Sequence, residues 1–198
     1  MQNSTTKVRA LTGTAMLGAV AAVLMYLEFP ILIMPAFVKL DVSELPALIA
    51  SFAYGPVSGV LVCLIKNLIK LPSTSTAAVG ELFNLVMGAL FVGVAGIVYK
   101  RNKTRKGAIV GALLGALVMA VVSVPYNYFI VYPAYVVMYH LPLEAIIGMY
   151  QAINPSVDGL LTCLLVFNLP FTFVKGVLDA VLCFLIYKPL SPILHGRK

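Results

Sequence analysis

The sequence predicts an all-α integral membrane protein, a six-helix transmembrane bundle with an outer lid loop between its first two helices. Of its 198 residues, 61% are hydrophobic and only 11% are charged, with a mean hydropathy of +1.01. So few charges could not cover a soluble surface, because soluble domains are about a quarter charged. The apolar runs do not alternate in polarity as the strands of a membrane barrel do. We therefore expect residues 1–198 to form a single transmembrane domain.

The first helix is expected at residues 10–27. Residues 1–27 lack a small-residue cleavage site after a short apolar core, so this run is predicted to be a retained span and not a signal peptide.

The distribution of cations sets the number of crossings. Ten of the fourteen Lys and Arg residues fall in three groups, at residues 7–9, in the block KRNKTRK at 100–106, and at 188–198. The positive-inside rule places all three groups, and so both termini, in the cytoplasm. An even number of crossings must then lie between the first two groups.

Residues 44–71 are expected to supply two of these crossings. Gly55-Pro56 is a turn signal in the middle of the stretch, which predicts a hairpin of helices at 44–54 and 57–71. Each half is shorter than the roughly 20 residues of a full span and needs shelter from neighbouring helices. A single helix through 44–66 is the alternative, and it would place five cations outside.

The remaining helices are expected at 77–99, 107–128 and 169–188. Pro170 fits the start of the last one, since the first turn of a helix has unpaired N–H groups anyway. Between the last two helices lies an outer segment, 129–168, that is rich in Tyr and Pro. Its apolar part, 157–167, is expected to pack as a short helix.

The stretch LEFPILIMPAFVKLDVSELP, residues 27–46, is mostly apolar yet carries three prolines and several charges. The prolines prevent a continuous helix. Its backbone could not face lipid, where each unsatisfied N–H or C=O group costs several kcal/mol. We interpret it as a lid over a ligand cavity. A plain connector at the membrane interface is the alternative.

The polar residues of the predicted spans gather toward the outer face. They are Lys39, Asp41, Glu44, Lys66, Asn67, Lys70, Glu81, Asn84, Asn127 and Glu144. Charges inside a bilayer are costly and usually face a protein interior or a wet cavity. This distribution predicts a polar cavity that opens outward beneath the lid.

Three residues are the best candidates for the cavity wall. Thr172 and Lys175 share a helix face because they are three positions apart, and Asn127 could join them across the bundle. Asn and Thr both donate and accept hydrogen bonds, while Lys only donates. Such a set suits a heteroaromatic ring with adjacent carbonyl and N–H groups. An ion pair between Lys175 and Asp179 is the structural alternative, and the two roles are compatible.

Six stretches together resemble the riboflavin-specific substrate-binding subunits, or S-components, of energy-coupling factor (ECF) transporters. They are LEFP, KLDVSELPALIASFAYGPVSG, IKNLIKL, GELFN, PYNYFIVYPAY and PFTFVKG, in that order, and the likeness covers residues 15–188. The resemblance implies that riboflavin binds near the outer face beneath the first loop. It assigns ring contacts to Asn127, Thr172 and Lys175, although relatives often carry Asn at the Thr172 position.

The resemblance also extends the list of site residues. The expected ligand-binding residues are Leu40, Asp41, Lys66, Asn67, Gly80, Asn84, Asn127, Thr172 and Lys175. Riboflavin is expected as a transported ligand and not as a cofactor. Flavin mononucleotide is a further possibility if Lys39, Lys66 and Lys70 hold its phosphate.

The implied partners are a transmembrane coupling subunit and two cytoplasmic ATPases, within a lipid bilayer and without nucleic acid. The family's Ala-x-x-x-Ala docking signature corresponds to Ala15 and Ala19. Small residues four apart let helices approach closely in lipid, so ordinary packing within the bundle is the alternative. Gly107, Gly111 and Gly115 show the same spacing and are interpreted as internal packing.

Other classes of function find less support. No G-x-S-x-G, H-E-x-x-H or P-loop motif occurs, and no catalytic or metal-ligating set can be nominated. The three cysteines are scattered in apolar runs and are expected to serve packing. A stand-alone transporter would be supported by an inverted repeat, which we do not find. A binding subunit for a different vitamin remains open.

Overall fold

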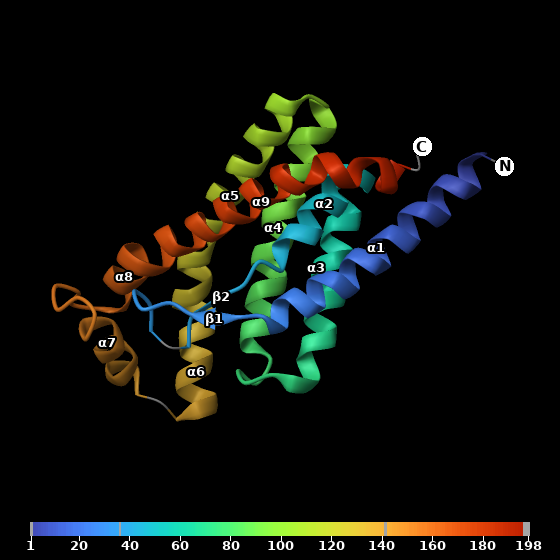
Figure 1. Cartoon of the computed structure of the whole chain (residues 1–198). Helices are drawn as coiled ribbons and strands as arrows, with labels where there is room; N and C mark the ends of the chain where they lie inside the picture. The colour runs from blue at the N-terminus through green and yellow to red at the C-terminus, as the bar shows by residue number, and fades with distance from the viewer. Residues whose placement is uncertain (1, 36, 141, 196–198) are drawn as a thin grey trace.

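The computed structural model describes residues 2–35, 37–140 and 142–195, with side chains between residues 7 and 187 (Figure 1). The helices are α1 (Gln2–Tyr26), α2 (Glu44–Tyr54), α3 (Pro56–Lys70), α4 (Val79–Arg101), α5 (Arg105–Tyr126), α6 (Tyr132–Tyr139), α7 (Leu143–Gln151), α8 (Leu160–Cys163) and α9 (Leu169–His195). Shorter elements are β1 (Phe29–Pro30), β2 (Lys39–Leu40), a 3-10 turn η1 (Leu71–Ser73) and two π-helical turns, η2 (Asn127–Val131) and η3 (Leu164–Asn168). The architecture is the predicted all-α membrane bundle.

Five stretches of the described residues are long and apolar enough to cross a membrane. They are Lys7–Tyr26, Pro56–Ser73, Val79–Arg101, Arg105–Tyr139 and Leu160–Tyr187. The 11-residue α2 is the sixth helix of the bundle, and it is too short to count by length alone.

The α2–α3 hairpin follows the break predicted at Gly55-Pro56. Gly55 adopts φ 107°, a conformation that side chains rarely allow, and Pro56 occupies the first turn of α3. A single helix through 44–66 is therefore wrong. Nearly all of α2 is buried, from Glu44 to Phe52, so neighbouring helices shelter this short segment from lipid.

Three helical runs are longer in the structure than the sequence indicated. α1 begins at Gln2 and not at residue 10. α5 ends at Tyr126, close to the predicted 128, but the chain stays helical through η2 into α6. α9 begins at Leu169, as predicted, but α8 and η3 precede it without a break, so the helical run is longer than expected. Each π-turn ends two residues before a proline, Pro133 or Pro170. A widened turn accommodates the missing N–H group without ending the helix.

Close packing of α4 against α5 depends on glycine. A Cβ atom on Gly111 would lie 2.7 Å from the Ala95 carbonyl oxygen, and one on Gly115 would clash with the Phe91 carbonyl oxygen. The role of these glycines in internal packing is confirmed. The three cysteines are also buried and free of disulfides.

The loop between α1 and α2 contains a small hairpin that the sequence did not predict. β1 pairs antiparallel with β2, with Phe29 opposite Leu40 and Pro30 opposite Lys39. Figure 1 shows this hairpin crossing from the end of α1 toward α5 and α8. Between its strands, Met34 is buried while Leu32 is almost fully exposed.

Candidate ligand-binding site

A cavity lies beneath the β1–β2 hairpin, among α3, α4, α5 and α9, with about 150 Å³ open to the centres of water-sized molecules. Six of the nine expected ligand-binding residues line it: Asp41, Gly80, Asn84, Asn127, Thr172 and Lys175. Leu40, Lys66 and Asn67 are not among its described lining residues. The cavity therefore draws together residues from the first loop to the last helix.

Lys175 reaches across the bundle to Asp41 in the first loop. Its Nζ lies 2.9 Å from Asp41 Oδ2, and both side chains are buried. Asp41 Oδ1 accepts hydrogen bonds from the Ser43 backbone N–H, at 2.8 Å, and from the Ser43 hydroxyl. The hairpin is thus tied to α9 by a buried ion pair. The ion pair with Asp179 considered above does not form, and neither carboxylate oxygen of Asp179 has a hydrogen-bond partner among the described residues.

Asp41 remains ionised in this environment. Burial by itself would raise its pKa, but the ammonium groups of Lys175 and Lys66 and the Ser43 hydroxyl outweigh burial and hold the pKa below its ordinary value. An ionised Asp41 is the stable partner for Lys175.

Lys66 lies behind the cavity wall and not on it. Its Nζ is 2.8 Å from Glu44 Oε1 and 2.5 Å from Ser43 Oγ, and the residue is fully buried. Glu44 also accepts a hydrogen bond from the Cys63 thiol, at 3.6 Å between sulfur and oxygen. Asn67 is buried nearby and donates to the Cys63 carbonyl oxygen. Glu44 already neutralises Lys66, so a ligand phosphate could pair with Lys66 only by displacing this carboxylate.

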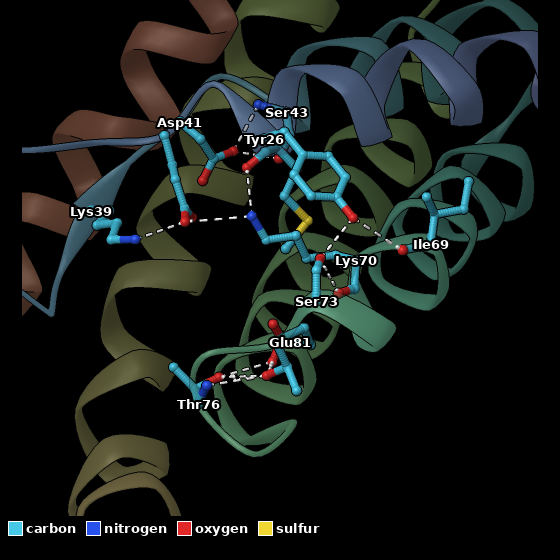
Figure 2. A network of polar contacts seen from close by, with 12 residues as sticks. Tyr26, Lys39, Asp41, Ser43, Ile69, Lys70, Ser73, Thr76 and Glu81 are labelled. Atoms are coloured by element: carbon cyan, nitrogen blue, oxygen red, sulfur yellow. Dashed lines mark hydrogen bonds and ion pairs between the residues drawn. The ribbon is translucent and has the colours of Figure 1, made fainter.

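The other two lysines considered for a phosphate share one carboxylate. Lys39 Nζ and Lys70 Nζ lie 2.8 Å and 3.4 Å from Glu28 Oε1, and Figure 2 shows the two side chains pointing toward one another. The Lys70 ammonium also lies 4.3 Å from the centre of the Tyr26 ring. These contacts fasten the hairpin to α1 and α3, so a phosphate would have to displace Glu28.

The cavity mouth is shaped by the turn before α4. Glu81 accepts hydrogen bonds from the hydroxyls of Thr74 and Thr76, at 2.7 Å and 2.8 Å (Figure 2). A Cβ atom on Gly80 would lie 2.7 Å from Thr76 Oγ1, so the absence of a side chain lets the turn fold close to the helix.

Asn127, Thr172 and Lys175 line the same cavity, and α5 and α9 approach each other closely at Gly176. A Cβ atom on Gly176 would lie 2.8 Å from Ala116 Cβ, which requires glycine at this contact. Asn127 occupies the first position of η2 and donates to the Ser123 carbonyl oxygen at 2.8 Å. Its amide is thereby oriented within the cavity wall, as π-turns often orient functional residues.

An aromatic cluster lies next to the cavity, and Phe37, Tyr132 and Tyr135 of this cluster line it. The ring of Phe37, on the lid, meets those of Tyr132, Tyr135 and Tyr150 edge to face, each with centroids 6.3 Å apart. The Tyr132 and Tyr150 hydroxyls are 2.5 Å apart, and Tyr150 donates to Asn168 Oδ1 at 2.7 Å. This cluster holds the lid down on the cavity.

Several lining residues were missed from the sequence, among them Phe37, Tyr132, Tyr135, Asn168 and Phe171. A signal existed for Asn168, which is a single polar residue in an apolar run two positions before Pro170. No comparable signal distinguished the tyrosines from an ordinary aromatic belt at the membrane interface.

The cavity wall mixes aromatic and apolar side chains with many polar and charged ones. This arrangement suits a planar heteroaromatic ligand, whose edge would meet Asn127, Thr172 and Lys175 while its faces contact Phe37 and Met119. The described residues contain no cluster of three or more His, Cys, Asp or Glu that could hold a metal ion.

On the outside of α1, Ala15 and Ala19 are exposed, whereas Gly18 and Ala22 face the bundle. A Cβ atom on Gly18 would lie 2.8 Å from the Ile65 side chain, so this glycine serves internal packing. The two alanines lie on a separate, lipid-facing side of the helix.

Comparison with known proteins gives consistent results. The family profile of the substrate-specific component of ECF transporters matches residues 9–187. Riboflavin transporter FmnP of Bacillus subtilis (strain 168) is 34% identical over 195 residues, which cover 97% of each chain. Riboflavin transporter RibU of Staphylococcus aureus (strain TCH60) is 31% identical over 180 residues, covering 91% of this chain and 89% of the relative.

The fold has a solved counterpart as well. The structure of the S component of a bacterial ECF transporter superposes with a TM-score of 0.74 at 30% sequence identity, covering 98% of this chain and 99% of the other.

Proposed function

This chain belongs to the family of ECF transporter substrate-specific components, and we propose that riboflavin is its ligand, captured in the cavity beneath the β1–β2 hairpin. Both relatives described above are riboflavin transporters. The observation that carries the proposal is that Asn127, Thr172 and Lys175 line one cavity together with aromatic and apolar side chains, among them Phe37, Phe171 and Met119. An isoalloxazine ring has a polar carbonyl and N–H edge and apolar faces, which match that distribution.

The chain is a multi-pass membrane protein and not an enzyme. Members of its family work with a transmembrane coupling component and two ATPases, which supply the energy for uptake. The positions of the cations support an orientation with both termini in the cytoplasm and the cavity outside. Riboflavin would then be a transported substrate and not a cofactor.

The exposed pair Ala15 and Ala19 is the proposed contact with the coupling component. Two small residues four positions apart give a partner helix close access to the α1 backbone in lipid. Ala15→Leu combined with Ala19→Leu should abolish ATP-dependent uptake in the assembled transporter while riboflavin affinity stays unchanged. Ala145→Leu, at an exposed alanine on α7, is the matched control and should leave both unchanged.

Free riboflavin fits the site better than its phosphorylated form. Lys39 and Lys70 contact Glu28, Lys175 contacts Asp41, and Lys66 behind the wall contacts Glu44. Among the described residues, a phosphate could therefore reach a lysine of this cavity only by breaking an ion pair.

A fluorescence titration tests the proposal. The purified protein, stripped of ligand in detergent, is titrated with riboflavin while flavin emission is followed, and saturable quenching is expected. A folded sample that leaves emission unchanged would refute the riboflavin assignment. A panel of other vitamins would then test the alternative of a different substrate within the same family.

A further inference from the structure

A second cavity lies at the opposite end of the bundle from the hairpin, between the α2–α3 turn and the end of α4. About 310 Å³ of it is open to the centres of water-sized molecules. Phe52, Tyr54 and Tyr99 supply its aromatic walls, and the exposed Lys100 and Lys103 complete its lining. Figure 1 shows this end at the top, where α4 turns into α5, away from α6 and α7.

The walls of this cavity are fixed by packing between helices. A Cβ atom on Gly96 would clash with Ser51 Oγ and would lie 3.0 Å from Pro56, so α4 meets the α2–α3 turn at van der Waals contact. Ser51 Oγ donates to the Val92 carbonyl oxygen at 2.7 Å. The rings of Phe52 and Tyr99 meet edge to face with centroids 5.0 Å apart. The cavity is therefore preformed.

The charged residues of the sequence segments at this end are all basic. Seven Lys and Arg residues fall at positions 7–9 and 100–106, whereas all seven Asp and Glu residues of the chain lie between positions 28 and 81 or between 144 and 179. Within the part of the chain that the structure describes, neither Lys100 nor Lys103 has an ion-pair partner. Arg9 adds to the positive potential, since it acts electrostatically on Tyr54. An anion from outside the protein could therefore pair with Lys100 and Lys103.

We propose that this cavity binds the phosphate headgroup of an anionic phospholipid. Lys100 and Lys103 would pair with the phosphodiester, and the Tyr54 and Tyr99 rings would contact the glycerol region, where tyrosine is favoured at membrane interfaces. Val57, which lines the cavity, and Ile97, which follows the lining residue Gly96, are 72% and 49% exposed. Apolar surface for the acyl chains therefore continues from the cavity. Basic pockets between transmembrane helices commonly bind the head groups of anionic lipids.

The test uses the full chain in lipid nanodiscs that contain either phosphatidylglycerol or phosphatidylcholine. Native mass spectrometry measures retained lipid, and thermal unfolding measures the stabilisation that each lipid provides. Lys100→Gln combined with Lys103→Gln removes the cavity cations. Arg105→Gln combined with Lys106→Gln makes the same charge change outside the cavity and is the matched control. Riboflavin titration shows whether each variant is folded. Lys103→Glu, in the exposed turn after α4, is a second variant that tests the same cavity by reversing one charge.

We expect the wild-type protein to retain and be stabilised by phosphatidylglycerol more than by phosphatidylcholine. The Lys100/Lys103 variant should lose this preference, with at least a roughly tenfold lower affinity for the anionic lipid, while the control keeps it. Equal losses in the two variants would overturn the proposal in favour of general surface charge. Stabilisation by inorganic phosphate alone would overturn it in favour of a free anion. Normal lipid retention with failed assembly of the coupling component would overturn it in favour of a protein contact.

Discussion

The two ends of the bundle differ in how their charged side chains are paired. At the hairpin end, lysines and carboxylates form buried ion pairs beside a cavity, Lys175 with Asp41 and Lys66 with Glu44. At the other end, Lys100 and Lys103 line a cavity with Phe52, Tyr54 and Tyr99, and neither lysine has an ion-pair partner among the described residues. Between the two cavities, residues 85–98 of α4 and 107–122 of α5 are apolar, and the two helices pack closely at Gly111 and Gly115. The comparison indicates a one-sided binding protein, because these buried ion pairs gather at the hairpin end.

The largest expected effect comes from breaking the Lys175–Asp41 pair. Lys175→Met should destabilise the protein by about 3–5 kcal/mol, because it leaves the buried Asp41 carboxylate without its main partner. It should also abolish measurable riboflavin binding. Thermal unfolding and flavin titration in detergent measure the two effects.

A compensating change separates the two roles of Lys175. Asp41→Asn in the Lys175→Met background should recover most of the stability but not the riboflavin affinity. Recovery of both would show that Lys175 serves structure alone.

The next largest effect on stability is expected at the contact between α4 and α5. Gly115→Val should cost about 3 kcal/mol of stability, near the upper end for overpacking, because its side chain would strike the Phe91 carbonyl oxygen. Leu117→Ala, at an exposed position of the same helix, should change the unfolding temperature little. Similar unfolding temperatures for the two variants would contradict the close α4–α5 contact.

Asn127→Ala should weaken riboflavin binding by about 1–2 kcal/mol, since one polar edge of the ligand would lose its partner. Stability should fall less, because the Asn127 amide otherwise bonds only to the Ser123 carbonyl oxygen of its own helix. Asn102→Ala, in the loop at the opposite end, is the control for the titration. An unchanged affinity in Asn127→Ala would remove this residue from the site.

The smallest effect is expected at Asp179. Its buried carboxylate has no hydrogen-bond partner among the described residues, so Asp179→Asn should change stability by less than about 1 kcal/mol. Thermal unfolding measures it. Severe destabilisation would mean that Lys175 depends on Asp179 as well as on Asp41.

The sequence could predict those features of the structure that depend on residues close together in the chain. Gly55-Pro56 and the grouping of cations predicted the short α2–α3 hairpin, and helical spacing placed Thr172 beside Lys175. The sequence could not predict that Lys175 forms its ion pair with Asp41, 134 positions away, and not with Asp179, one helical turn further along α9. That choice depends on how the hairpin folds over the cavity. The two helical runs that continue past their expected bounds depend on π-turns, which leave no periodic signal in hydrophobicity.

We expect the flavin to bind at the hairpin end alone. Because the chain has no Trp, single variants can report on each end separately. Phe171→Trp places a reporter in the hairpin-end cavity, and Tyr99→Trp places one in the opposite cavity. Riboflavin titration should strongly quench tryptophan emission in the Phe171→Trp variant and quench it much less in Tyr99→Trp. Stronger quenching in the Tyr99→Trp variant would contradict the account.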